Sequence, residues 1–223
     1  MGEQVKILFE DNHIIVVEKK PDQPVMGDAS MDYDLLTEIK DYVKIKYNKP
    51  GNAYIGLVHR LDRPVGGVMV FAKTSKAASR LSESIRKQEF EKRYFAVVEG
   101  VLDQPQAVLE NWLYKNESEK TSYVCDEHEP NAKLARLKYQ EIKTVSNLTL
   151  LDIELYTGRH HQIRVQLSNL KHPIYGDMKY GNGPKGHIAL YAHSLGFLHP
   201  VSKQFMSFVC EPDYSIPPWP LFK

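Results

Sequence analysis

The chain has no long hydrophobic run. Among its 223 residues the longest apolar stretches are residues 14–17 and the glycine-containing run 65–72, whereas about 20 apolar residues are needed to span a bilayer. The N-terminus shows no charged start followed by an apolar core, and Lys6 stands where a myristoylation signal needs Ser or Thr. We therefore expect a cytoplasmic protein without a membrane partner.

Cysteine is scarce as well. Cys125 and Cys210 are the two cysteines of the chain, too few for a disulfide framework or a cysteine-based zinc site. The adjacent His160 and His161 raise the question of a metal, but no His-Glu-x-x-His motif occurs and their cluster contains no carboxylate. We expect no metal, and cysteines that stay reduced.

The net charge is only +1, which taken alone argues against a nucleic acid partner. The charges are nevertheless unevenly distributed: residues 59–93 carry nine Lys and Arg against four acids, and residues 159–187 carry five against one. These segments can form one basic face if the fold brings them together. Solvated faces of surface helices explain such charge runs equally well.

The composition is otherwise that of a globular domain, with 42% hydrophobic and 26% charged residues. Periodicity and turn residues predict strands at 7–9, 14–17, 68–71 and 94–98, and a hairpin over 134–155 that turns at Ser146-Asn147. Three helices are predicted. The first covers residues 32–47, the second begins at a Thr74 cap and has a buried stripe through Leu81 and Ile85, and the third covers residues 162–170.

The order of these elements indicates the fold class. Strands interspersed with helices, without strict βαβ alternation, favour an α+β fold with a mixed, mostly antiparallel sheet and flanking helices. We expect one domain over residues 1–223, and a proline-rich tail from Glu211 that lies extended on the surface.

The most unusual chemistry lies in His59-Arg60-Leu61-Asp62-Arg63-Pro64-Val65-Gly66-Gly67. One carboxylate stands between two arginines, in a turn that precedes an apolar strand. Nearby positive charges favour the ionised form of Asp62, which suits a nucleophile or a general base. A surface ion pair that caps a turn would give the same pattern.

Two further segments could bind anions. Residues 157–164, Thr-Gly-Arg-His-His-Gln-Ile-Arg, place two arginines and two histidines at the start of a predicted helix, where backbone N–H groups and cationic side chains favour phosphate. Residues 176–186 are glycine-rich like a phosphate loop but lack its Gly-Lys-[Ser/Thr] ending. We interpret that second segment as a mobile basic loop.

Five segments, in order, resemble the blocks of the RluA-like pseudouridine synthases. The His-Arg-Leu-Asp signature matches residues 59–62, the Lys-x-Tyr-x-Ala-x-Val-x-Gly strand matches 92–100, and the Thr-Gly-Arg-x-His-Gln-Ile-Arg segment matches 157–164. Residues 173–181 and 190–200 complete the order. The chain departs from the family pattern at Val65-Gly66, His160 and Tyr191, and with 58 residues before His59 we expect no N-terminal S4 domain.

The resemblance implies a pseudouridine synthase fold with a central catalytic cleft, and an RNA pseudouridine synthase that isomerises uridines of rRNA or tRNA without a cofactor. It implies that Asp62 is the catalytic aspartate, that Tyr94 stacks on the uracil, and that Arg164 pairs with Asp62. Substrate-binding roles fall to five further residues: Arg60, Arg63, Arg159, His161 and Leu190. We expect RNA as the partner of a monomeric enzyme.

Two other classes of protein compete with this interpretation. A glycosidase also cleaves a bond at the sugar C1′ carbon, but it generally needs two cooperating carboxylates. Asp62 has no second acid in its own segment, and Asp177 belongs to a loop. An RNA-binding module with a decayed catalytic pocket is the other alternative. The presence of Asp62, Tyr94 and Arg164 together argues against decay.

Overall fold

The computed structural model describes residues 5–27, 30–181 and 187–223 of the chain. It divides into two compact units. The first consists of Met1–Phe90 and Ala192–Cys210, and the second of Glu91–Tyr191 and Glu211–Lys223. In the described residues, no helix combines the length and the hydrophobicity that a membrane span requires.

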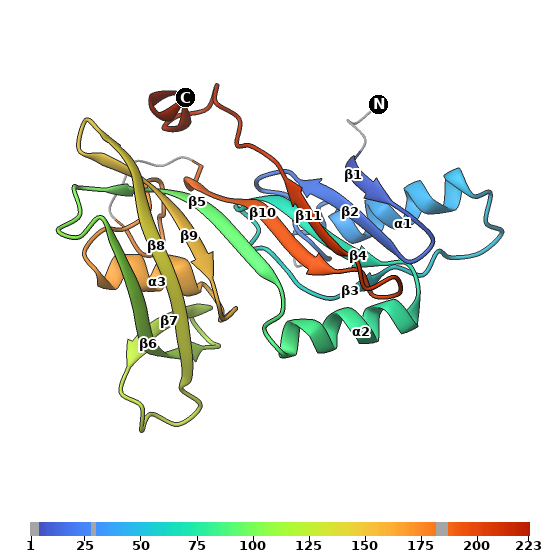
Figure 1. Cartoon of the computed structure of the whole chain (residues 1–223), viewed down its shortest axis with the longest axis horizontal. Coiled ribbons are helices and arrows are strands. Elements are labelled where there is room, and N and C mark those ends of the chain that lie inside the picture. The colour runs from blue at the N-terminus through green and yellow to red at the C-terminus, as the bar shows by residue number, and fades with distance from the viewer. Residues whose placement is uncertain (1–4, 28–29, 182–186) are drawn as a thin grey trace. The chain divides into compact units, whose positions relative to one another are not determined.

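The first unit is built on antiparallel strands (Figure 1). Its strand order is β1-β2-β4-β10, with β11 added to β10 and the short β3 to β4. Every residue of β4 is buried, as are Ile14–Val17 of β2, so these two strands form the core of the unit. The bounds are β1 Lys6–Glu10, β2 Ile14–Lys19, β3 Gly56–Leu57, β4 Gly66–Ala72, β10 Leu190–Leu198 and β11 Phe205–Val209. The first two residues of β10, Leu190 and Tyr191, belong to the second unit.

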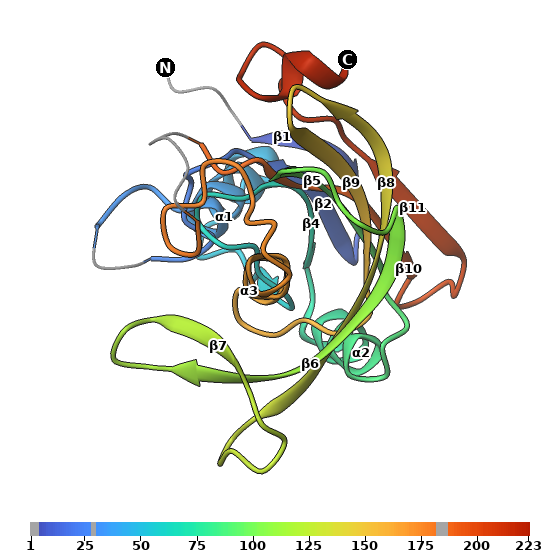
Figure 2. The same cartoon turned by 90° about the vertical axis from the view of Figure 1, so that its left-hand side faces the viewer.

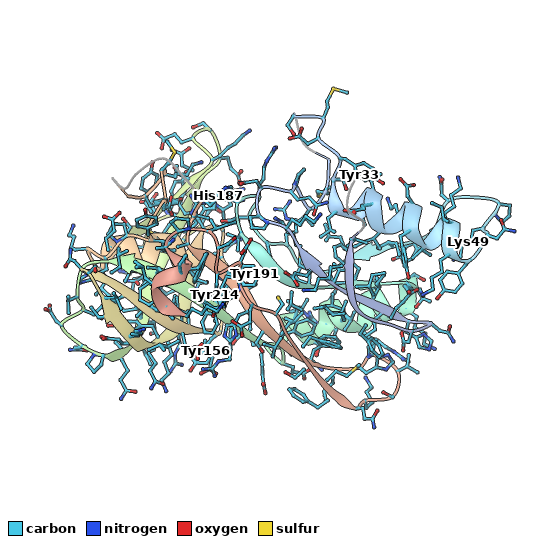
Figure 3. The ribbon with its side chains drawn as sticks, turned by 90° about the horizontal axis from the view of Figure 1, so that it is seen from above. Tyr33, Lys49, Tyr156, His187, Tyr191 and Tyr214 are labelled. Carbon is cyan, nitrogen blue, oxygen red and sulfur yellow. The ribbon has the colours of Figure 1, made fainter. Side chains whose placement is uncertain are left out.

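Two capped helices belong to the same unit. Helix α1, Leu35–Lys46, begins where the Asp34 side chain accepts a hydrogen bond from the Thr37 N–H at 2.9 Å, and Figure 3 shows Tyr33 and Lys49 near its two ends. Helix α2, Ser75–Arg86, begins at the Thr74 cap. The sequence predicted both helices, although Ser84 rather than Ile85 completes the buried stripe of α2.

The second unit is an antiparallel sheet in the order β5-β9-β8-β6-β7. The predicted hairpin is confirmed, because Ser146 and Asn147 link β8 to β9 with φ values of 51° and 62°, which is typical of a two-residue type I′ turn. Helix α3, Gln162–Asn169, lies on the concave side of this sheet (Figure 2). The strand bounds are β5 Glu91–Glu99, β6 Gln106–Asn116, β7 Thr121–Cys125, β8 Lys133–Val145 and β9 Leu148–Leu155.

Helix α3 is buried on almost all sides, including its polar residues. The prediction placed it correctly and expected one apolar face, but Gln162, Arg164 and Gln166 are buried as well. Each has a partner: Gln166 Nε2, for example, donates to Asn111 Oδ1 at 2.8 Å. Buried polar groups are tolerated when they are hydrogen-bonded in this way.

The C-terminal tail corrects one prediction. It does not stay extended on the surface, because Trp219–Phe222 form a 3₁₀ turn, η1, which packs against β8. Trp219 and Phe222 are both buried there. Burial of these two aromatic side chains outweighs the preference of the preceding prolines for an extended chain.

The fold class is confirmed as α+β, with antiparallel strands and flanking helices.

Candidate active site

The turn that carries Asp62 is fixed from inside the first unit. The Val65 N–H donates to the Asp62 carbonyl at 3.0 Å, and His59 Nε2 accepts from the Val70 N–H at 3.1 Å. Asp62 is partly exposed. Because the chain turns back onto the buried strand β4, the carboxylate stands at the end of a rigid element.

A fully buried lysine anchors the same turn. The Lys19 ammonium donates to the carbonyls of Lys20, Arg63 and Val65 at 2.9, 2.8 and 2.8 Å, and its side chain has no exposed surface. Burial lowers the pKa of Lys19 to about 7, against the opposing effect of Asp22 and Asp62. Sequence reasoning missed this residue, although a lysine that ends an apolar strand was a visible signal.

Gly67 explains part of the local sequence. Its φ is +127°, and a Cβ on this residue would lie 2.2 Å from the Ala192 carbonyl oxygen of β10. A side chain would therefore push β10 away from β4. Gly67, the second glycine of the pair after Asp62, permits this close approach.

The two arginines beside Asp62 are exposed and contact the preceding loop. Arg63 forms an ion pair with Asp32 and donates from Nη1 to Ser30 Oγ at 2.9 Å. Arg60 Nη1 lies 3.8 Å from the Met26 sulfur. Arg60 has no carboxylate partner within the residues that the structure describes, which leaves its charge available to a ligand.

Tyr94 lies on β5 in the second unit, opposite Ile153 of β9, and its side chain is largely buried. The segment before Leu190 runs beside the same strand, because the Val97 N–H donates to the Ala189 carbonyl at 2.9 Å. Leu190 is 5% exposed. Backbone hydrogen bonds along β5 thus hold both Tyr94 and Leu190 in place.

Arg164 is held by a buried carboxylate from a later loop. Its Nε and Nη2 donate to the two oxygens of Asp177, each at 2.7 Å, and its guanidinium lies 5.2 Å from the centre of the Tyr180 ring. Burial acts to raise the pKa of Asp177, but the hydrogen bonds and the charge of Arg164 hold that pKa below its usual range. Such a two-pronged pair fixes the plane of the guanidinium.

This pair corrects the expectation of a mobile basic loop at 176–186. Over residues 176–181 the chain turns back on itself, with Asp177 buried and also accepting from the Lys179 N–H at 2.9 Å. Gly176 has a φ of +76°, and a Cβ there would lie 2.4 Å from the His187 carbonyl oxygen. The rest of the predicted loop, residues 182–186, lies outside the described residues.

The histidine pair before α3 belongs to a polar cluster of the second unit. The rings of His160 and His161 are stacked, with centroids 3.7 Å apart. His161 Nδ1 lies 2.7 Å from the Tyr180 hydroxyl, and His160 Nδ1 lies 2.9 Å from Ser122 Oγ. These contacts connect β7, the start of α3 and the loop that carries Asp177.

The predicted site residues thus divide between the units: Arg60, Asp62 and Arg63 lie in the first, and Tyr94, Arg159, His161, Arg164 and Leu190 lie in the second. Over the described ranges, no group of three or more His, Cys, Asp and Glu side chains is arranged to hold a metal.

Comparisons with known proteins identify the family. The family model for RNA pseudouridylate synthase matches residues 13–169, so the chain belongs to the RNA pseudouridylate synthase family. It is an RNA pseudouridine synthase, an isomerase that converts uridine in RNA to pseudouridine. The resemblance seen in the sequence is thereby confirmed.

Individual relatives agree with this assignment. The chain is 30% identical over 218 residues to the ribosomal large subunit pseudouridine synthase C of Buchnera aphidicola, covering 93% of this chain and 67% of the relative. It is 32% identical over 223 residues to the ribosomal large subunit pseudouridine synthase D of Zymomonas mobilis, covering 93% and 69%. The chain therefore spans about two thirds of the length of these relatives.

Two solved structures share the fold. Human RNA pseudouridylate synthase domain containing 4 superposes with a TM-score of 0.79 at 24% identity, covering 94% of this chain and 89% of that chain. Human RNA pseudouridylate synthase domain containing 1 gives 0.74 at 22% identity, covering 97% and 86%. The predicted pseudouridine synthase fold is confirmed.

Proposed function

We propose that this enzyme modifies uridines of ribosomal RNA and that Asp62 is its catalytic aspartate. The relatives named above are ribosomal large subunit enzymes, which supports the substrate. The anchored turn supports the residue: Lys19 binds the Arg63 and Val65 carbonyls that follow Asp62. These hydrogen bonds fix the turn and so hold the Asp62 carboxylate in one orientation.

The reaction breaks the bond between uracil N1 and the sugar C1′ and forms a bond between uracil C5 and C1′, while C5 gives up its proton and N1 takes one up. The ionised Asp62 would act by attack at C1′ or by taking a proton from the sugar, and both routes need the anion. No electrons or groups are gained from outside, so the isomerisation requires no cofactor.

The remaining site residues would bind the nucleotide. A uridine must leave its stack to be reached, which costs a few kcal/mol. Stacking on Tyr94 would return about 1–3 kcal/mol, with Leu190 beneath the base and Arg60 in the gap that the base leaves. Arg164, oriented by Asp177, would be the third catalytic residue, while Arg63, Arg159 and His161 would contact the RNA.

The test of the residue is Asp62→Asn, with Asp103→Asn at an exposed position as the matched control. The first variant should form no pseudouridine and bind RNA within a few-fold of the parent, because phosphate contacts lie elsewhere. The control should keep full activity. Turnover by the Asp62 variant would refute the assignment.

The test of the substrate is a map of pseudouridine in total RNA from cells with and without the gene. Loss of one or more sites in ribosomal RNA supports the proposal, whereas loss confined to tRNA overturns it. We also propose a monomeric, cytoplasmic enzyme; sedimentation as a dimer, or fractionation with membranes, would contradict this.

A further inference from the structure

Among the described residues, Lys92 near Tyr94 has no counter-charge. It lies two residues before Tyr94 on β5, so the two side chains share one face of the strand about 7 Å apart. Lys92 is only partly exposed, and over the described residues it forms no hydrogen bond or ion pair. Burial, and then the charge of Arg159, lower its pKa.

Arg159 approaches the same place from the loop before α3. Its backbone N–H donates to Gln162 Oε1 at 3.0 Å, and its Nε donates to the Leu134 carbonyl at 2.9 Å. The guanidinium is therefore anchored along one edge, and its terminal nitrogens have no carboxylate partner in the part of the chain that the structure describes. Gly158, the residue before Arg159, lies next to Lys92: a Cβ on Gly158 would be 3.8 Å from Lys92 Nζ.

Neighbouring cations of the same unit are compensated. Arg93, next to Lys92 but on the opposite face of β5, pairs with Asp152, and Arg164 pairs with Asp177. Two adjacent positive charges without a counter-charge destabilise a free protein, more so when one is withdrawn from water. An anion with several oxygens would satisfy both, because charged hydrogen bonds to phosphate are strong.

We propose that Lys92 and Arg159 bind a backbone phosphate of the RNA beside the uridine that stacks on Tyr94. The place of Lys92 on β5 indicates which phosphate it binds. A nucleotide whose base lies on Tyr94 extends its sugar and phosphate over about the distance between two strand residues on one face, which is the distance from Tyr94 to Lys92. Gly158 leaves room for the phosphate to approach the backbone. The place of the uridine rests on the proposed function; the anion subsite itself rests on the two cations.

The first test compares Lys92→Met with Lys143→Met, an exposed lysine of β8 in the same unit. Lys92→Met should weaken RNA binding at least tenfold and lower the salt slope of log K by about 1, as expected for one lost phosphate contact. Its melting temperature without RNA should equal or exceed that of the parent, because an uncompensated charge is removed. Lys143→Met should change binding little. A lower melting temperature with unchanged RNA affinity would show a purely structural lysine and overturn the proposal.

The second test identifies the anion. The parent should bind an RNA oligonucleotide less tightly when one linkage beside the target uridine is an uncharged methylphosphonate, whereas Lys92→Met should lose nothing further on that RNA. Arg159→Gln should behave like Lys92→Met. If the neutral linkage and the Lys92→Met substitution each weaken RNA binding and their effects add, the proposal is overturned. If inorganic phosphate stabilises the parent against thermal unfolding while the neutral linkage leaves RNA affinity unchanged, the ligand is a free anion. That result would also overturn the proposal.

These binding measurements do not depend on turnover. If Asp62→Asn stays active while Lys92→Met binds RNA weakly, the proposed catalytic residue fails and the phosphate subsite stands. If Asp62→Asn is inactive and Lys92→Met binds normally, the subsite alone fails.

Discussion

Individual buried charges position the candidate catalytic groups of this enzyme. Lys19 binds two carbonyls of the Asp62 turn, and Asp177 holds the guanidinium of Arg164. Both side chains are almost wholly buried, where electrostatic contacts are screened less than at the surface. Each therefore fixes the geometry of a neighbouring group.

The ion pair of Arg164 gives a prediction at this scale. Asp177→Asn should lower the free energy of unfolding by about 3–5 kcal/mol, because it leaves the charge of Arg164 buried without a counter-charge. Urea unfolding measures this difference. Asp152→Asn is the matched control, since its partner Arg93 is 44% exposed and surface pairs contribute about 0–1 kcal/mol. Equal losses in the two variants would contradict the argument.

At the scale of elements, the end of β1 is tied to α1 and to the residue that follows β4. Glu10 accepts hydrogen bonds from Tyr42 at 3.0 Å, Lys46 at 2.7 Å and Tyr47 at 2.8 Å, and it pairs with Lys73. Burial acts to raise the pKa of Glu10, but the hydrogen bonds from Lys46, Lys73 and the two tyrosines lower it to about 2.

The pKa of Glu10 predicts how stability changes with pH. A carboxyl whose pKa is lower in the folded than in the unfolded state adds stability above the unfolded value, here near 4.5, and loses it as the pH falls toward 2. Glu10→Gln should therefore melt a few degrees below the parent at pH 7, and the difference should shrink between pH 4.5 and 2. A difference independent of pH would mean that packing alone is affected.

At the scale of the whole molecule, the distribution of charge matters more than its sum. A net charge of +1 conceals the basic segments at 59–93 and 159–187, which supply Arg60, Lys92 and Arg159. An RNA partner that binds through phosphates displaces counterions, so affinity falls steeply with salt.

RNA binding by the parent should therefore weaken more than tenfold between 50 and 200 mM salt, as expected for several phosphate contacts. Filter binding or fluorescence anisotropy with a uridine-containing RNA measures this. An affinity that hardly changes over this range would remove the argument for a basic RNA-binding surface.

The sequence by itself determined the elements whose signals are local. Thr74 caps α2, and Ser146-Asn147 form the β8–β9 turn, because capping and turn geometry depend on residues within a few positions. Strands β6 and β7 were not predicted, since only Leu113 and Ser122 are buried along them and their apolar pattern is weak. Ordered motifs also determined the family and the candidate residues Asp62, Tyr94 and Arg164.

Only the tertiary structure decided how those residues are held. Lys19 reaches carbonyls 44 and 46 positions away, and Arg164 reaches Asp177 across a turn that the sequence suggested to be mobile. It also decided that Trp219 and Phe222 are buried and that Gly158, the neighbour of Arg159, lies beside Lys92 Nζ. Such contacts depend on how distant segments pack, and no local propensity encodes that packing.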